Sequence, residues 1–274
     1  MKMRFRILLA ALLAVVLGGL AWKMLLSREP VYQGRSLNSW LHDLDSSIQE
    51  RLPVEQVRIL MAEKQKKREV AEQAIRQIGT NALPALITML RSKDSKLKEK
   101  LFVWSTKQPI SWLRLQGASE RRWLANEGFR VLGEEAEPAI PFLIEMLKDR
   151  DEVGVPVTTD ALMAIGPKAF LAVICALINQ DYRIRIGALF ALEEAAPQVS
   201  PAIVVPVLVE RLTDTNAVVR SLAVFILGKY GSAAKAAIPG LLKALNDPNA
   251  ERRSDVAKAL KQIDPEGATE SGVK

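Results

Sequence analysis

GSAAKAAIPGLLKALND, at residues 231–247, returns in altered form at residues 133–149 as GEEAEPAIPFLIEMLKD, with eight of seventeen positions identical. The second half of this pattern, Pro-x-Leu-x-x-x-Leu-x-Asp, also starts at Pro206, and a shorter match starts at Pro84. The copies from Pro206 and Pro239 lie 33 residues apart, and those from Pro141 and Pro206 lie 65 apart, which leaves room for a degenerate copy at 166–181. A repeat of this length with helical patterning predicts an array of stacked helix pairs.

Each unit has the features of two helices joined by a turn. The proline is expected early in the first helix, where its missing N–H and fixed φ cost least. An aspartate follows the last leucine and opens the turn, and small or apolar residues such as Ala223 and Leu227 face the neighbouring helices. Several second helices should end at a glycine that follows an apolar residue. These glycines are Gly79, Gly133, Gly166 and Gly228.

The start of the second helix carries an arginine in three units. Arg220 and Arg253 follow an aspartate by six residues, and Arg185 follows Asp181 by four. Such a series can track the phosphates of a nucleic acid. Pairing with the aspartate of the same unit, together with hydrogen bonds to the turn, explains it more economically. No stretch shows sustained strand alternation, so we expect an all-α chain.

These residues resemble the HEAT repeat family in its short bacterial form, with the consensus A-x-x-A-I-P-x-L-x-x-x-L-x-D…R-x-x-A-x-x-x-L-G. The resemblance covers about residues 66–264 and is strongest at 133–149 and 206–264. It implies a right-handed α-solenoid of about five to six stacked helix pairs, whose second helices line a concave face that holds partner proteins. The chain departs from the pattern where Thr158 replaces the arginine and where the 166–195 unit lacks the usual proline.

The N-terminus carries a membrane signal. Residues 7–26 form an apolar stretch interrupted only by Lys23, and about twenty residues suffice to cross a bilayer. Residues 1–29 hold +4 of the net charge of +7, which favours a cytoplasmic N-terminus and an extracytoplasmic repeat domain, periplasmic if the protein is bacterial. Cleavage near Ala21, followed by secretion, is the alternative. The body is only weakly basic, so we expect no nucleic-acid partner.

Residues 30–65 are expected to cap the first repeat, and residues 265–274 to form a tail. Ser36 can cap a helix on which apolar residues recur at spacings of three and four. They are Leu37, Trp40, Leu41, Leu44 and Ile48. Pro53 then starts a second helical region.

An insertion at about residues 93–121 lengthens one repeat. Trp104, Trp112 and Trp123 either pack on each other to fill a gap between repeats or contact a partner. We take Trp104 and Trp112, together with Arg183, Arg185 and Arg220, as candidate partner-binding residues.

The sequence offers no catalytic or metal-binding pattern. His42 is the only histidine and lies on the capping helix, where a surface role is expected. Cys175, the only cysteine, is surrounded by apolar residues and should act as a small hydrophobic side chain. We therefore expect a non-catalytic scaffold without a cofactor or small-molecule substrate, anchored through residues 7–26 and binding another protein. Two alternatives come from relatives of the repeat family: a lyase-like protein that assists chromophore attachment, and a nucleic-acid-binding protein.

Overall fold

A computed structural model describes residues 29–45, 53–94, 117–149, 154–195 and 200–270. Two compact units make up the chain, Met1–Ala85 and Leu86–Lys274. The predicted anchor at 7–26, together with Ile48, Trp104 and Trp112, lies outside the described residues.

The described part of the first unit starts with a small β-hairpin, so the expectation of an all-α chain is wrong at this point. Strand β1 (Val31–Tyr32) pairs antiparallel with β2 (Arg35–Ser36). Gln33 and Gly34 form the connecting turn with φ of 49° and 74°. Two consecutive positive φ values are the mark of a type I′ turn, which matches the twist of the two strands. Strands of two residues are too short to show the alternation by which a sequence reveals a strand.

Helix α2 (Leu37–His42) follows the hairpin directly, and the predicted cap and apolar stripe are confirmed. The Ser36 hydroxyl accepts a hydrogen bond from the Ser39 N–H at 3.3 Å, and the described members of the stripe are buried. The Trp40 indole donates to the Tyr32 carbonyl at 3.2 Å. The Arg35 guanidinium lies 3.8 Å from the centre of the Trp40 ring and 2.7 Å from the Asp43 carboxylate. These contacts fasten the hairpin to the helix.

Helix α3 (Val54–Ile78) starts directly after Pro53, as predicted, and ends at Gly79. It runs without a break through residues 65 and 66, where the capping region was expected to give way to the repeats. The short 3₁₀ helix η1 (Gly79–Ala82) follows, and helix α4 (Leu83–Leu90) contains the boundary between the two units.

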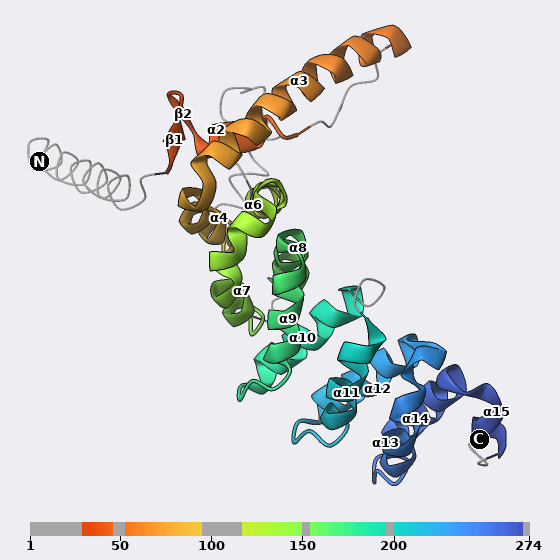
Figure 1. The fold of residues 1–274 in the computed structure, drawn as a ribbon. Helices are drawn as coiled ribbons and strands as arrows, with labels where there is room; N and C mark the ends of the chain where they lie inside the picture. Colours follow the sequence, from red (N-terminus) through yellow and green to blue (C-terminus); the bar gives the residue numbers. More distant parts are fainter. Residues whose placement is uncertain (1–28, 46–52, 95–116, 150–153, 196–199, 271–274) are drawn as a thin grey trace, which may run out of the picture. The chain divides into compact units, whose positions relative to one another are not determined.

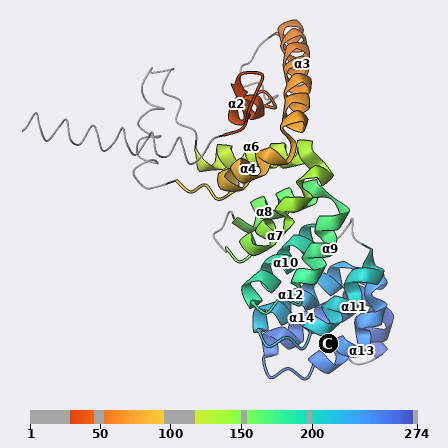
Figure 2. The same ribbon diagram turned by 60° about the vertical axis from the view of Figure 1, so that its left-hand side comes forward.

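The second unit is a stack of helix pairs (Figure 1). Helix α6 (Ala118–Leu132) comes first, and four pairs follow in the described part of the chain. The second helices α6, α8, α10, α12 and α14 pack in succession, and Figure 2 shows α9, α11 and α13 beside them. The pairs are α7 (Ile140–Met146) with α8 (Gly154–Ile165), α9 (Pro167–Ala176) with α10 (Tyr182–Ala195), α11 (Pro201–Arg211) with α12 (Ala217–Lys229), and α13 (Ile238–Ala244) with α14 (Ala250–Ile263). Helix α15 (Pro265–Glu270) follows α14, so the prediction of a tail from residue 265 is wrong for the residues that are described there.

Three of the repeat prolines lie where the sequence predicts them, and one of these is Pro84 in the first turn of α4. Pro141 and Pro239 occupy the first turn of α7 and α13, after the 3₁₀ helices η2 (Gly133–Ala139) and η4 (Gly231–Ala237). The prediction is wrong for Pro206, which lies inside α11 because that helix already begins at Pro201. An interior proline cannot donate the hydrogen bond to the carbonyl four residues earlier. Pro201 occupies the first turn of α11, so the helix starts more than one turn before Pro206.

The glycines predicted to end second helices are confirmed at three positions and wrong at the fourth. Gly79, Gly133 and Gly166 have φ of 57°, 53° and 99°, in the region that favours glycine. Gly228 instead lies inside α12, where it is buried, and the helix runs on to Lys229. A Cβ at Gly228 would lie 3.3 Å from the Ala259 Cα, so this glycine permits close packing against α14.

In each of the last two helix pairs, the turn before the second helix has a capping feature that the sequence analysis missed. The Asn216 side chain accepts from the N–H groups of Val218 and Val219 and caps α12. Asn249 caps α14 in the same way. In both units the aspartate two residues earlier accepts from the N–H of this asparagine at 2.8 Å. The pattern Asp-x-Asn thus satisfies three N–H groups of each turn, which are otherwise left without partners.

The two ends of the insertion lie together. The Asp94 carboxylate accepts from the Ala118 N–H at 2.6 Å, and the Arg121 guanidinium donates to the Ser92 hydroxyl at 2.9 Å. The helix that follows the insertion is therefore joined to the chain that precedes it.

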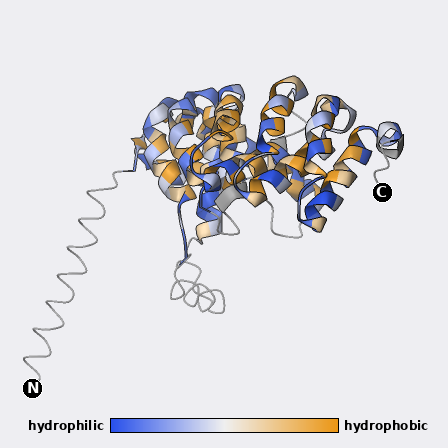
Figure 3. Cartoon of the chain, turned by 90° about the horizontal axis from the view of Figure 1, so that it is seen from below, coloured by the Kyte–Doolittle hydropathy of each residue, from blue (hydrophilic) through white to orange (hydrophobic). Residues whose placement is uncertain are grey.

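Buried small residues bring the helices of the second unit close together. Ala223 and Leu227 are fully buried, as predicted from the repeat. Gly187 of α10 packs so tightly that an added Cβ would lie 2.3 Å from the Leu147 carbonyl oxygen. Figure 3 shows hydrophobic and hydrophilic residues alternating around the helices, as expected where each helix has one packed side.

Candidate functional site

The repeat arginines hold the turns of their own units. The Nη1 atom of Arg220 donates to the carbonyls of Asp214 and Thr215 at 2.6 and 3.2 Å. Arg253 makes the corresponding bonds to the carbonyls of Asp247 and Pro248 at 2.8 and 3.0 Å. The expected hydrogen bonds to the turn are confirmed, but the acceptor is the carbonyl of the aspartate and not its carboxylate. Charged donors satisfy carbonyls that the first helix leaves open at its end.

Two further arginines fill the same role and were missed in the sequence. Arg68 donates to the Leu44 carbonyl at 3.1 Å in the first unit. Arg122 donates to the Ser92 carbonyl at 3.2 Å in the second. Each lies eleven residues before a glycine with positive φ, Gly79 or Gly133, as Arg220 does before Gly231. An arginine at this distance from a helix-ending glycine is the signal that could have found them.

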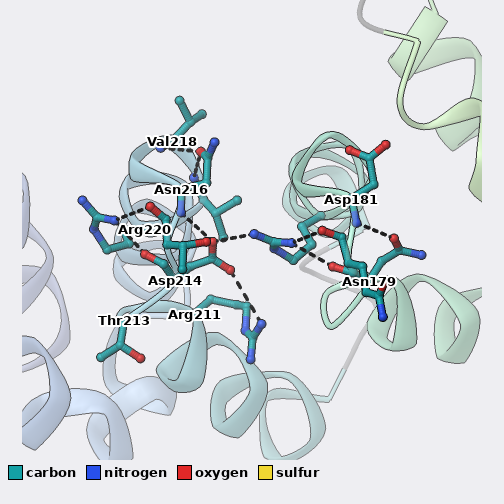
Figure 4. Close-up of polar contacts among 12 residues, drawn as sticks. Asn179, Asp181, Arg211, Thr213, Asp214, Asn216, Val218 and Arg220 are labelled. Carbon is teal, nitrogen blue, oxygen red and sulfur yellow. Dashed lines mark hydrogen bonds and ion pairs between the residues drawn. The ribbon is translucent and has the colours of Figure 1, made fainter.

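Arg185 makes a contact between two neighbouring repeats of the second unit. It holds its own turn through the carbonyls of Asn179 and Gln180 at 2.8 and 3.0 Å, and its Nη2 atom donates to the Asp214 carboxylate at 2.7 Å. The expected partner, Asp181, is wrong, because Asp181 binds Arg183 instead. Figure 4 shows Asp214 at the centre of these contacts, with Arg220 and Arg211 beside it.

The Asp214 carboxylate is ionised and buried. Desolvation raises its pKa, but the hydrogen bonds from Arg185 and from the Asn216 N–H outweigh this effect. The charge of Arg211, 3.7 Å away, acts in the same direction, and the pKa lies below its ordinary value. The pair is therefore a structural connection between α10 and the turn before α12.

The candidate arginines differ in exposure. Arg183 has half of its side chain in solvent, whereas that of Arg185 is 9% exposed. Hydrogen bonds from the side chain and N–H of Arg183 lower the pKa of Asp181 to about 2. Arg220 is half-buried against its turn. Partner contacts by these three arginines stay a prediction, as they do for Trp104 and Trp112.

One position on each second helix carries a side chain that varies in chemistry from unit to unit. It lies five residues after the repeat arginine and between two pairs of buried residues. We call these residues the central row. From α6 to α14 they are Glu127, Asp160, Phe190, Phe225 and Lys258. Asp160 is assigned by its distance of six residues from Gly166, which equals that of Glu127 from Gly133, so the missing arginine belongs at residue 155 and its prediction at Thr158 is wrong. The row passes from acidic through aromatic to basic.

The aromatic members of the row lie on adjacent helices and are exposed. Phe190 of α10 and Phe225 of α12 have 36% and 50% of their surface in solvent. Lys229 of α12 lies 5.3 Å from the centre of the Phe225 ring and binds Glu193 of α10 at 2.9 Å. The two aromatic rings are thus bordered by charged groups that hold the helices together.

The first helices also carry exposed apolar side chains. They include Leu171 and Ile178 on and just after α9, and Ile203 on α11. Cys175 is exposed on α9, so the expectation that it is enclosed by apolar residues is wrong. Trp123 of α6 is 44% exposed, and so does not have the buried environment expected of a packed tryptophan cluster.

The described residues contain little that suggests catalysis. His42 lies on the surface of α2, as predicted. Among the described parts of the chain, no group of three or more histidine, cysteine, aspartate or glutamate side chains is placed to hold a metal ion. A pocket of about 280 Å³ in the first unit lies between the hairpin and α3, lined by Tyr32, Gln33, Gln73, Arg76 and Gln77. Within the part of the chain that is described, no helix combines the length and apolar character needed to cross a bilayer.

Comparisons with known proteins agree with the repeat pattern at the C-terminal end. Residues 205–271 match the family model for HEAT repeats. No curated protein sequence matches the chain significantly. Among solved structures, a designed armadillo repeat protein in complex with the peptide (KR)4 is 18% identical, with a TM-score of 0.39, covering 84% of this chain and 100% of that chain.

Two engineered proteins are similar to a comparable degree. They are 20% and 18% identical, with TM-scores of 0.38 and 0.37. The matches cover 86% and 84% of this chain, and 61% and 96% of the engineered proteins. The assignment therefore rests on the family match at residues 205–271 and on the helix pairs themselves, which agree with the HEAT-like repeat pattern predicted at 206–264.

Proposed function

We propose that this chain is a scaffold that binds another protein along the second helices of its repeats, with Phe190 and Phe225 at the centre of the contact. The observation that carries the proposal is the exposure of these two rings at equivalent positions of adjacent repeats. Large apolar side chains that are exposed together, with a polar border, mark interaction surfaces. Aromatic residues are enriched at the centre of such interfaces, where a few contacts supply most of the binding energy.

The row also explains how one fold can select a partner. Residues that stack the helices are buried and leave little freedom for substitution, whereas the four members of the central row from Asp160 to Lys258 are exposed and can differ between repeats. The repeat supplies the frame, and the differences between units supply the specificity. The partner-binding role thus requires no catalytic group and no cofactor.

The location of the scaffold is part of the proposal. We infer from the apolar stretch at 7–26 and its basic flank that the chain is anchored in a membrane with the repeats outside the cytoplasm. The test is protease treatment of intact spheroplasts that express the full chain. Digestion of the repeats without lysis supports this topology, and protection until lysis contradicts it. Release of the repeats as a chain that begins at Trp22 would show cleavage instead of anchoring.

Partner binding can be tested by cross-linking from the proposed surface. A photoreactive phenylalanine analogue replaces Phe190 or Phe225 in the full chain, and a matched control carries it at Leu171 or Ile203 on the first helices. We expect partner adducts from the first two positions only. Adducts from the control positions alone would show that the other layer binds.

The same surface can be tested by removing the rings. Truncating a central aromatic residue of an interface costs about 2 kcal/mol, which corresponds to roughly 30-fold weaker binding. The double variant Phe190→Ala/Phe225→Ala should therefore lose the partner found by cross-linking, while Leu171→Ala/Ile203→Ala retains it. Equal retention by both variants would contradict the proposal.

A further inference from the structure

The pocket between the hairpin and α3 has two walls of different origin. Its volume is about 280 Å³. The hairpin contributes Tyr32 and Gln33, and α3 contributes Val70, Gln73, Ala74, Arg76 and Gln77. Four of these helix residues recur at spacings of three and four, so they form one stripe of α3. The pocket therefore has one helical wall and one wall made by the hairpin.

The helical wall is apolar at one end and charged at the other. Val70 is 47% exposed, and the buried methyl group of Ala74 leaves room beside it. Arg76 lies six residues after Val70, which places it about 9 Å further along the helix axis. The amides of Gln73 and Gln77 form no hydrogen bond with another residue in the described part of the chain. A ligand along this wall thus contacts an apolar group at one end and hydrogen-bond donors at the other.

Arg76 is the one charged group among the described residues that line the pocket. Glu72 lies between two arginines, 3.0 Å from Arg68 Nε and 3.5 Å from Arg76 Nη2. The closer pair is also the less exposed, because 27% of the Arg68 side chain is in solvent against 53% of that of Arg76. A guanidinium has five N–H donors, and its charge and planar shape match one carboxylate. Arg76 therefore has donors available to a carboxylate that enters the pocket.

Gln33 lines the pocket in a backbone conformation that glutamine rarely adopts. Its φ is 49°, and this position of a type I′ turn favours asparagine or glycine. Its Nε2 atom donates to the Tyr32 hydroxyl at 3.3 Å. Because that hydroxyl accepts from Gln33, its own O–H group can donate to a ligand. A strained residue whose side chain lines a pocket indicates a binding role.

We propose that this pocket binds a carboxylate that is attached to a short apolar group. Arg76 pairs with the carboxylate, the glutamine amides donate to its oxygen atoms, and Val70 with Ala74 contacts the apolar part. The same chemistry occurs in a free short-chain acid and in a glutamate next to an apolar residue of a protein. The site belongs to the first unit and does not rest on the surface proposed for the protein partner in the second.

Protection of Arg76 from phenylglyoxal, which modifies exposed guanidinium groups, tests the site. The full chain in detergent micelles is labelled with and without 4-methylpentanoate, and peptide mass spectrometry gives the rate at each arginine. At about 10 mM ligand, and with the dissociation constant on the order of 1 mM expected for a molecule of this size, labelling of Arg76 should slow about tenfold. Arg130, which is 61% exposed in the second unit, is the internal reference and should not change.

Two double variants locate the protection. Gln73→Ala/Gln77→Ala removes two donors while alanine preserves the helix, and should lose most of the protection at Arg76. The matched control Gln56→Ala/Gln65→Ala changes two glutamines of the same helix outside the pocket and should be protected like wild type. Equal protection of wild type and Gln73→Ala/Gln77→Ala would overturn the inference.

Two further variants test the strained residue and the independence of the site. Gln33→Asn should unfold at a higher urea concentration, because asparagine suits the turn, and its shorter side chain should weaken the protection. Full protection in this variant would contradict the role of Gln33. Phe190→Ala/Phe225→Ala should be protected like wild type, so failure of the proposed partner surface leaves this result unchanged.

Other probes define the ligand and its source. Acetate lacks the apolar group and 4-methylpentanamide lacks the charge, so each should protect less than 4-methylpentanoate. A dipeptide of leucine and glutamate with blocked ends carries both groups. Stronger protection by the dipeptide supports an acidic segment of a protein as the source, and stronger protection by the free acid supports a small molecule. Equal protection by acetate, or stronger protection by inorganic phosphate, would overturn the inference.

Discussion

Replacing Asp214 with alanine tests whether neighbouring repeats depend on a buried ion pair. The change removes the acceptor of Arg185 Nη2 and of the Asn216 N–H, at 2.7 and 2.8 Å. Breaking a buried pair by removing one partner costs about 3–5 kcal/mol. Arg185 keeps its bonds to two turn carbonyls, so we expect the low end of this range, about 3 kcal/mol.

Urea unfolding followed by circular dichroism measures the loss, and hydrogen exchange shows where it occurs. Amides of α10 and α12 should lose protection more than those of α6. The control Asp255→Ala removes a carboxylate from the solvent-exposed pair with Lys258, and should cost less than about 0.5 kcal/mol. In a double-mutant cycle, Arg185→Met and Asp214→Ala should show a coupling of about 2 kcal/mol.

Acid should reduce the difference between wild type and Asp214→Ala. The folded pKa of Asp214 is below its ordinary value of 3.8, so its ionised form contributes stability above that value. This contribution is lost as the pH falls through the folded pKa, and the two unfolding curves should converge there. The reasoning is refuted if Asp214→Ala costs no more than Asp255→Ala at pH 7, or if the effects in the cycle simply add.

Three further predictions concern the second unit. Gly187→Ala should lower the free energy of unfolding in urea by about 3 kcal/mol, because the added Cβ meets main-chain atoms, whereas the Cβ of the control Gly240→Ala meets movable side chains and should change it by no more than about 1 kcal/mol. Equal effects of the two variants would show that α10 can shift. Asn249→Ala should cost about 1 kcal/mol through loss of the α14 cap, and faster hydrogen exchange confined to the first turn of α14 should accompany it. Asp160→Asn/Glu194→Gln should unfold at a higher urea concentration than wild type at pH 7, because the pKa of both carboxyl groups is raised in the folded state and their ionisation therefore opposes folding. This gain in stability should vanish as the pH falls through the raised pKa values, and a variant that is less stable than wild type at pH 7 would contradict the prediction.

The sequence predicted the helix pairs because their signals are local. Pro53, the first-turn prolines of α7 and α13, and the Ser36 cap each act within a few residues. The error at Gly228 has the same origin. An apolar residue followed by glycine suits both a helix end and a buried helix contact, and only the neighbouring helix α14 distinguishes the two.

The partners of the arginines and the exposed residues of α9 could not be read from the sequence. Arg185 reaches Asp214 in the next unit, and a pair that crosses units depends on how the repeats stack. In α9 nearly every residue is apolar, so no periodic pattern indicates which side faces solvent. Leu171 and Cys175 lie on the exposed side although their chemistry suggests the core.

The candidate site was predicted only in outline. The sequence analysis proposed two tryptophans and three arginines as partner-binding residues, and none of them belongs to the central row. The hydrogen bond from Asn126 of α6 to Asp160 of α8 joins two repeats, and no pattern within one repeat reveals it.

The bond between Asp94 and the Ala118 N–H has a consequence for engineering this chain. The entropy cost of closing a loop grows only slowly with the number of residues in it. Doubling the length of the segment between these two residues should therefore lower stability by only about 0.6 kcal/mol. The site between these two residues should therefore accept a foreign sequence, such as a fluorescent domain or an epitope, without loss of the helices on either side. The chain thus offers a fusion point between Asp94 and Ala118.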